Sequence, residues 1–288
     1  MLQQRIITGS ILIAAIFVAA MYLSATGWKI LASGILLVAA YELAALMGIK
    51  QTYSRLLYCG LIGAMFLYIN GNLDMEANLS ADLLVFSAGF WIFILIFLIF
   101  LHDGVLRNKK FIQCALIVTS NLALLLSFHA VVLAYDTRPI LLIHGDLDID
   151  KSSFFLVLLF LVVVSDTSAY FFGKRFGKKK FFPNISPNKT LAGFWASNLC
   201  VLLYAFICAF IFSEYYGAGY DKIINTVIVF MILNLLAITG DLFFSALKRQ
   251  ANVKDTGTFL PGHGGVLDRV DSLMPVLCVW LLAWTYIV

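Results

Sequence analysis

LLVFSAGFWIFILIFLIFL, residues 83–101, is an apolar run that contains no charged side chain. A helix that crosses the hydrocarbon core of a bilayer, about 30 Å thick, needs about 20 mainly apolar residues. This run is long enough to do so. It therefore predicts a membrane-spanning helix.

The same pattern recurs along the chain, which is 62% hydrophobic and only 12% charged. Soluble domains are closer to half apolar and a quarter charged, so one soluble core could not bury this surplus. The sequence predicts an all-α fold, a polytopic integral membrane helical bundle with about nine transmembrane helices. Residues 1–288 form a single membrane domain, since no internal repeat or linker divides them. The nine candidate spans are Ile6–Leu23, Ile30–Met47, Leu56–Tyr68, Leu83–Leu101, Phe111–Leu133, Ser153–Phe172, Leu191–Phe212, Ile223–Leu247 and Ser272–Ile287.

The distribution of Lys and Arg predicts the orientation of the bundle. With nine spans and a cytoplasmic N-terminus, 16 of the 20 Lys and Arg residues fall on the cytoplasmic side. Cytoplasmic loops carry an excess of these residues. We therefore expect the N-terminus and the last polar loop to be cytoplasmic, with a polar cavity that opens to the same side.

The last polar loop, residues 245–271, concentrates charge directly before the ninth span. Asp241, Ser245 and Lys248 follow i, i+4, i+7 spacing, which places them on one face of a helix. Asp268 and Asp271 are three residues apart and share a face at the start of the ninth helix. Ionised residues at membrane depth mark functional sites by default, because they are costly unless paired or hydrated.

Carboxylates beside cations suit metal-dependent phosphate chemistry. Mg²⁺ is usually held by one or two carboxylates plus phosphate oxygens, and Lys or Arg stabilises charge that develops on phosphoryl oxygens. The glycines around His263 allow positive φ and an anion-binding nest of backbone N–H groups. Plainer structural readings stay open: Asp271 as a helix cap, Lys248 and Arg249 as boundary markers, His263 as a packing residue, and the glycines as a tight turn.

Two further charged features lie outside this loop. Asp166 sits within an apolar run, where an unpaired carboxylate would be costly, so it needs a partner or a site. The basic cluster Lys174–Lys180 follows it and is either a topological anchor at anionic lipid or a binding surface for an anionic substrate. Glu42, inside the second span, is either a structural polar contact or part of a substrate path.

Two sequence patterns give the chain a specific resemblance. The last polar loop and the segment from Asp166 to Thr190 together resemble the phosphatidate cytidylyltransferase (CDP-diacylglycerol synthase) family. One residue departs from the family pattern: Ala192 stands before Gly193, where members often carry an acid. The first pattern reads Ser245-x2-Lys248-Arg249-x4-Lys254-Asp255-x-Gly257-x2-Leu260-Pro261-x-His263-Gly264-Gly265-x2-Asp268-Arg269-x-Asp271, and the second contains Asp166, Ala169, Tyr170, Phe171, Gly173, Gly177, Ser186, Pro187, Lys189 and Thr190.

The resemblance implies transfer of a cytidylyl group from CTP to phosphatidate, which gives CDP-diacylglycerol and pyrophosphate. It implies a catalytic half over about residues 153–288 and Mg²⁺ as cofactor, as one or two ions. CTP, phosphatidate and membrane lipid are the expected partners; a homodimer is a candidate assembly, and no nucleic acid is expected. A bacterial inner (plasma) membrane is the expected location.

The resemblance also implies a set of site residues, in three groups. The expected metal ligands are Asp241, Asp268 and Asp271. The expected catalytic residues are Ser245, Lys248, Arg249, Lys254, Asp255, His263 and Arg269. The expected substrate-binding residues are Asp166, Lys189, Thr190, Gly264 and Gly265.

Two other functions stay open at this point. Another CTP-using lipid enzyme, such as a polyprenol kinase or an archaeol-type cytidylyltransferase, would use similar phosphate chemistry. A secondary transporter would use Asp166, Asp241 and Glu42 as ion relays, and inverted repeats and broken helices would support that reading.

Overall fold

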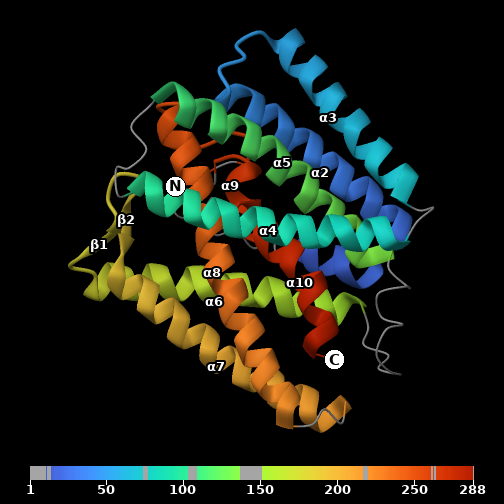
Figure 1. The fold of residues 1–288 in the computed structure, drawn as a ribbon, viewed down its shortest axis with the longest axis vertical. Coiled ribbons are helices and arrows are strands. Elements are labelled where there is room, and N and C mark those ends of the chain that lie inside the picture. The colour runs from blue at the N-terminus through green and yellow to red at the C-terminus, as the bar shows by residue number, and fades with distance from the viewer. Residues whose placement is uncertain are drawn as a thin grey trace.

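The computed structural model describes residues 11, 14–73, 77–102, 109–136, 151–216, 220–260, 262 and 264–287, and these residues are mainly helical (Figure 1). Residues 14–22 are helical. The elements that follow are α2 (Ala25–Leu46), α3 (Thr52–Leu73), α4 (Ala77–His102), α5 (Lys109–Asp136), α6 (Lys151–Phe176), β1 (Lys180–Phe182), β2 (Ser186–Thr190), α7 (Leu191–Tyr216), α8 (Tyr220–Gln250), α9 (Leu267–Val270) and α10 (Leu273–Ile287).

Seven of the described helices, α2 to α8, are long and apolar enough to cross a membrane. The prediction of a polytopic helical membrane protein is thus confirmed, whereas the count of nine is not. The first predicted span, Ile6–Leu23, lies partly outside the described residues. The ninth corresponds to α10, whose 15 residues fall short of the about 20 that a span needs. The predicted span Leu56–Tyr68 is the middle of a longer helix, since α3 has 22 residues.

The helices pack in two connected groups (Figure 1). α6 packs on α7, and α7 packs on α8. In the other group α2 packs on both α3 and α5. α10 joins the two groups, because it contacts α8 on one side and α4 and α5 on the other.

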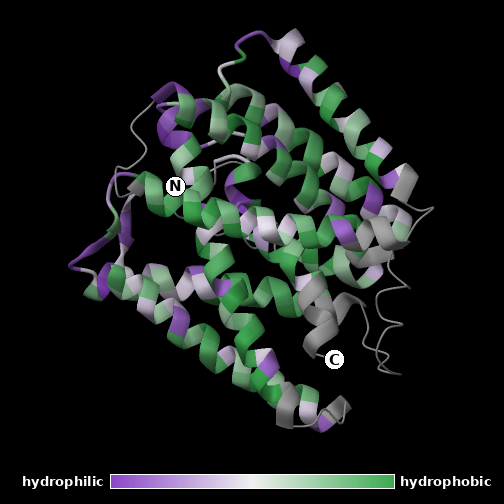
Figure 2. Cartoon of the chain, in the orientation of Figure 1, coloured by the Kyte–Doolittle hydropathy of each residue, from purple (hydrophilic) through white to green (hydrophobic). Residues whose placement is uncertain are grey.

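The outer surface of the bundle is apolar. α7 exposes Trp195, Leu199, Leu203, Phe206 and Phe210, which recur every three or four residues and so form one stripe. Contiguous apolar surface of this extent marks an interaction with membrane or protein, and the length of the helices matches a bilayer. Figure 2 shows the hydrophilic residues gathered instead at the β1–β2 hairpin and at the C-terminal end of α8.

A short antiparallel hairpin interrupts the helices between α6 and α7. Lys180 of β1 pairs with Thr190 of β2, and Phe182 pairs with Ser186. The hydropathy pattern of the sequence did not predict these strands. They carry the basic end of α6 back toward the start of α7, which places the Lys189–Thr190 segment beside α6.

Glycines allow α6 and the start of α7 to approach closely. A Cβ atom at Gly177 would lie 2.5 Å from the Thr190 hydroxyl oxygen, and one at Gly193 would lie 2.6 Å from the Ala169 carbonyl oxygen. Real Cβ atoms essentially never come within 3.0 Å of a heavy atom outside their own and adjacent residues. The glycine spacing in the sequence therefore has a packing cause.

The predicted ninth helix is divided into two pieces. Asp268 lies in the four-residue α9 and Asp271 directly follows it, whereas α10 starts at Leu273. Pro275 is tolerated in the first turn of α10, because the N–H that it lacks would have no partner within the helix there. The two aspartates therefore belong to a separate turn before the last helix.

Candidate active site

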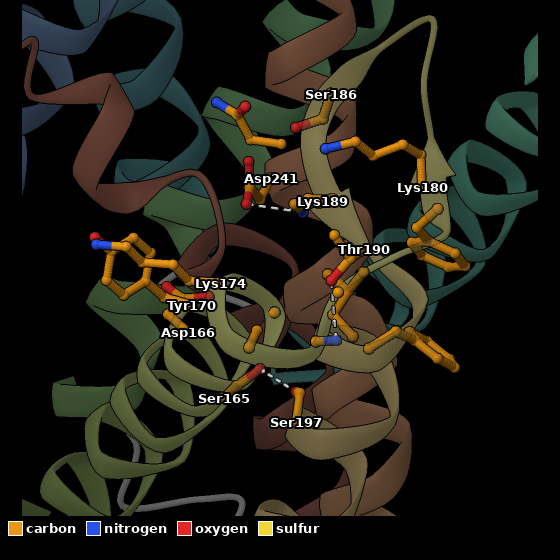
Figure 3. A pocket seen from close by; sticks show the side chains of 18 residues that line it. Ser165, Asp166, Tyr170, Lys174, Lys180, Ser186, Lys189, Thr190, Ser197 and Asp241 are labelled. Atoms are coloured by element: carbon orange, nitrogen blue, oxygen red, sulfur yellow. Dashed lines mark hydrogen bonds and ion pairs between the residues drawn. The ribbon is translucent and has the colours of Figure 1, made fainter.

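A cavity of about 680 Å³ lies among α6, the hairpin, α7 and α8 (Figure 3). Four residues that the sequence predicted for the site line it, although they come from different elements: Asp166, Lys189, Thr190 and Asp241. Lys174 and Lys180, from the basic cluster, also line it. The cavity thus combines carboxylates with ammonium groups, a composition suited to anionic ligands and cations together.

An ion pair between β2 and α8 crosses the cavity. Lys189 Nζ lies 2.8 Å from Asp241 Oδ2, and the two side chains are 24% and 31% exposed. The Ser245 hydroxyl donates a hydrogen bond of 3.2 Å to the other oxygen, Asp241 Oδ1. This contact confirms the predicted shared helix face of Asp241 and Ser245. Because the pair is partly exposed, a ligand can reach both charges.

Thr190 has a structural role at this cavity. Its side chain is buried, and its hydroxyl accepts a hydrogen bond of 3.2 Å from the Gly193 N–H. Thr190 therefore caps the N-terminus of α7, where the first N–H groups have no partner within the helix. Ala192, the departure from the family pattern, lies within the first turn of α7, which holds no acid.

Three buried polar side chains from α6, α7 and α8 lie beside the cavity and were not among the predicted site residues. Ser165 and Ser197, which line the cavity, both donate to Asn234 Oδ1, at 2.6 Å and 3.0 Å. Their hydroxyl oxygens lie 2.9 Å apart (Figure 3). A buried polar group is costly unless it is hydrogen-bonded. The position of Ser165 directly before Asp166, within an apolar run, was therefore the sequence feature that could have indicated this cluster.

A second ion pair joins α8 to α9. Lys248 Nζ lies 2.7 Å from Asp268 Oδ1, and the side chains are only 12% and 7% exposed. Asp268 Oδ2 accepts the backbone N–H groups of Thr256, at 2.8 Å, and Gly265, at 3.0 Å. Burial opposes ionisation of Asp268, but the hydrogen bonds from Lys248 and the two N–H groups outweigh it and hold its pKa below the usual range.

Asp271 is a buried carboxylate near the other acids. Burial raises its pKa well above the usual range; the nearby Asp241 and Asp166 carboxylates raise it further, while Lys248 opposes them. Asp271 Oδ1 accepts the Ser272 N–H at 2.8 Å. A bound cation would relieve this concentration of negative charge, which makes the site chemically suited to a metal.

No ready-made metal cage is present in the described part of the chain, where no three His, Cys, Asp or Glu side chains are arranged to hold an ion. The predicted ligands Asp241 and Asp268 each direct one oxygen to a lysine. Mg²⁺ commonly takes only one or two protein carboxylates and completes its shell with phosphate oxygens and water. The donor set therefore fits a metal that arrives with a phosphate substrate.

The other predicted residues are dispersed around the loop. Arg249 donates to the carbonyl oxygen of Ile185 in the hairpin turn, at 3.3 Å. Lys254, Asp255 and Arg269 are exposed, and Arg269 interacts electrostatically with Asp166. His263 lies outside the described residues.

Gly264 and Gly265 lie against carboxylates of the protein. Gly264 has φ +81°, and a Cβ there would lie 2.7 Å from Asp268 Oδ2. A Cβ at Gly265 would overlap oxygens of Thr256 and Glu42. Both glycines are thus explained by close packing and, at Gly264, by a backbone conformation that L side chains rarely adopt.

Comparison with known proteins agrees with the resemblance of the two patterns. Phosphatidate cytidylyltransferase of Staphylococcus saprophyticus is 45% identical over 124 residues, which cover 43% of this chain and 46% of that protein. The chain thus aligns with less than half the length of this relative. Phosphatidate cytidylyltransferase of Haemophilus influenzae is 29% identical over 286 residues, 95% of each chain. A family model described as the cytidylyltransferase family matches residues 3–287. Because that match covers nearly the whole sequence, the chain belongs to the cytidylyltransferase family.

Proposed function

We propose that this protein is a phosphatidate cytidylyltransferase that converts CTP and phosphatidate to CDP-diacylglycerol and pyrophosphate. Family membership and the names of the two relatives support the type of reaction. The observation that carries the proposal is the partly exposed Lys189–Asp241 pair inside a cavity bounded by membrane-spanning helices. These findings do not favour a lipid kinase or a transporter.

The cavity accounts for the binding of two phosphate-bearing substrates. Lys174, Lys180 and Lys189 supply ammonium groups for phosphate oxygens. The outer faces of α6 and α7 are apolar. The acyl chains of a lipid substrate can therefore stay in the bilayer beside these helices while its head group enters the cavity. The cavity volume of about 680 Å³ lies within the range of small-molecule sites, roughly 300–1,000 Å³.

In the proposed reaction a phosphate oxygen of phosphatidate attacks the α-phosphorus of CTP. A new P–O bond forms, the bond between the α- and β-phosphates breaks, and pyrophosphate leaves with that bond's electron pair. Because the attacking oxygen is already anionic, the site needs no strong general base. Its work is to position two anions and to neutralise the charge that develops between them.

We assign phosphate binding to the cations around the cavity and loop, Lys189, Lys248, Arg249, Lys254 and Arg269. Ser245 holds Asp241 by its hydroxyl, so it orients that carboxylate. His263 stays assigned to a substrate contact. Gly264 and Gly265 are assigned to the backbone that shapes the substrate-binding loop, Asp255 to the support of that loop, and Asp166 and Thr190 to the cavity wall opposite α8.

We propose Mg²⁺ as the cofactor, with Asp241, Asp268 and Asp271 as candidate oxygen ligands. When bound, the ion would polarise the phosphoryl group and neutralise charge on pyrophosphate. The closeness of the Asp241, Asp271 and Asp166 carboxyls, which adds to burial in raising the pKa of Asp271, supports this assignment, because a cation would allow these groups to be ionised together. For these ligands to bind it, Lys189 and Lys248 would turn from the carboxylates toward substrate phosphates.

We further propose that the cavity opens to the cytoplasm of a bacterial cell, in its inner membrane. The asymmetry of Lys and Arg supports this orientation, and the named relatives are bacterial. Single cysteines placed in the hairpin and labelled in intact cells and in inverted vesicles would test it. Labelling of Asn184→Cys only in inverted vesicles is expected; equal labelling in intact cells would contradict it.

The reaction itself is tested with purified protein in lipid nanodiscs, CTP labelled at the α-phosphate, and phosphatidate. We expect the label to enter the lipid with equimolar pyrophosphate, and EDTA to stop the reaction. Release of CDP with a phosphorylated lipid would instead identify a kinase. No turnover of CTP at all would remove the proposal and leave a transporter as the alternative.

A further inference from the structure

Glu42 is a buried carboxylate in α2 that binds the last polar loop, more than two hundred residues later in the chain. Only 5% of the residue is exposed. Its Oε1 accepts the Val266 N–H at 3.0 Å, and its Oε2 accepts the Leu267 N–H at 2.8 Å. Oε2 also accepts the Thr256 hydroxyl at 3.0 Å. All three partners are donors, so the contact requires a group that only accepts.

Glu42 supplies the hydrogen-bond acceptors that the loop itself does not provide at the start of α9. Val266 occupies the N-cap position of this helical turn and makes no side-chain cap hydrogen bond. The first N–H groups of a helix have no partner within it. Glu42, from another helix, accepts two of them and so takes the place of a local cap.

Thr256 is held from two sides by two carboxylates. Asp268 accepts its backbone N–H, and Glu42 accepts its hydroxyl. Since Lys248 binds the other oxygen of Asp268, the chain of contacts runs from Glu42 through Thr256 and Asp268 to Lys248. The position of this candidate catalytic pair therefore depends on α2.

The loop is shaped to fit around the Glu42 carboxylate. A Cβ at Gly257 would lie 2.7 Å from Glu42 Oε1, and a Cβ at Gly265 would overlap Oε2. Two glycines of the loop thus face one side chain. Glu42 does not line the cavity, so it has no direct path to a ligand bound there.

We propose that Glu42 is a positioning residue for cytidylyl transfer, which holds Thr256 and residues 265–268 so that Lys248 and Asp268 face the reacting phosphates. This inference rests on the proposed function. It makes the N-terminal half of the chain part of the active-site framework and predicts that the C-terminal half alone does not assemble a working loop.

Glu42→Gln is the decisive variant. In glutamine an NH₂ group replaces one of the two carboxylate oxygens. At least one of the three donors therefore loses its acceptor and meets the amide N–H instead. We expect kcat to fall at least about tenfold, because an unsatisfied buried donor displaces the loop. KM for CTP and for phosphatidate should stay within about threefold, because the cavity lysines are unchanged. A kcat within about twofold of wild type would overturn the proposal.

Hydrogen exchange measured by mass spectrometry tests the contact without any turnover. The Val266 and Leu267 amides are protected by Glu42 in the wild type, so a peptide spanning them should exchange faster in Glu42→Gln, while peptides from α6 and α7 keep their rates. An unchanged rate at residues 266–267 would mean that Glu42 does not hold the loop. If the wild type fails to transfer a cytidylyl group, the proposed function fails, whereas this measurement still decides the contact.

Thr256→Val gives a second route should Glu42→Gln not fold. It removes only the hydroxyl donor and keeps the backbone N–H that Asp268 accepts. We expect kcat of Thr256→Val to fall below that of wild type, and an unchanged kcat would count against the proposal. Where Glu42→Gln folds, adding Thr256→Val to it should cause no further loss. Fully multiplicative losses would show that the two residues act independently, against the proposal.

Trp28→Ala is the matched control for general damage to α2. Trp28 is buried against Phe155, 14 residues before Glu42 and so about 21 Å away along the helix. This variant should lower Tm but leave kcat of the folded protein and exchange at residues 266–267 unchanged. If Trp28→Ala reduced kcat as much as Glu42→Gln, the effect of Glu42 would be one of stability alone.

Discussion

Two aspartate–lysine pairs, both involving α8, have the same chemistry and different surroundings. The Lys189–Asp241 pair is about a quarter to a third exposed and lines the cavity. The Lys248–Asp268 pair is nearly buried, and the free oxygen of Asp268 holds two backbone N–H groups of the loop. The first pair lies open to a ligand in the cavity, whereas the second also holds the loop in place, so Asp268 has a structural role in addition to its proposed part in the reaction. Because both pairs consist of an aspartate and a lysine, the difference in their roles comes from their burial and their neighbouring hydrogen-bond donors.

Among the substitutions that test this comparison, Asp241→Asn should have the largest effect on activity. We expect kcat/KM to fall about a thousandfold, which corresponds to about 4 kcal/mol, because a proposed ligand of the charge-neutralising cation is lost together with the partner of Lys189. Stability should change little, since partly exposed ion pairs contribute only about 0–1 kcal/mol. Steady-state kinetics and thermal unfolding in nanodiscs measure the two quantities.

Glu214→Gln is the matched control for Asp241→Asn. It also turns an acid into an amide, but at an exposed position near the far end of α7 from the hairpin. It should keep wild-type activity. Near-normal turnover by Asp241→Asn would show that the exposed pair is not the reacting one.

Asp268→Ala should instead lower stability, by about 3 kcal/mol, because it leaves a buried lysine and two N–H groups without their acceptor. Activity should fall as a consequence of the displaced loop. Chemical unfolding monitored by fluorescence measures the loss. Unchanged stability with lost activity would mean that Asp268 does not hold the loop, and the structural difference between the two pairs would fail.

Thr190→Ala should give the smallest effect, a destabilisation of about 1 kcal/mol from loss of the α7 cap. Thermal unfolding measures it, and Thr190→Ser, which keeps the hydroxyl, is its control. If Thr190→Ala reduced kcat strongly without a change in Tm, the Thr190 hydroxyl would contact substrate in addition to capping α7.

Local spacing made some parts of the site predictable. Asp241 and Ser245 are four residues apart on one helix, so the sequence predicted a contact that the structure contains. The hairpin was missed because Ser186–Thr190 is short and polar and carries no alternation of apolar residues. The division of the predicted ninth helix into α9 and α10 was missed because a hydropathy profile does not reveal a turn before Pro275.

By itself, the sequence determined that this is a multi-pass membrane protein, because its apolar runs are long enough to cross a bilayer and too numerous for one soluble core to bury. It also determined the family, since the loop pattern is a property of residue order. Only the tertiary structure decided which carboxylate is exposed to the cavity and which also holds the loop, because burial and backbone donors come from segments far apart in the chain. For the same reason it alone joined Glu42 of α2 to the loop: that contact spans 224 residues from Glu42 to Val266, a separation that no local pattern encodes.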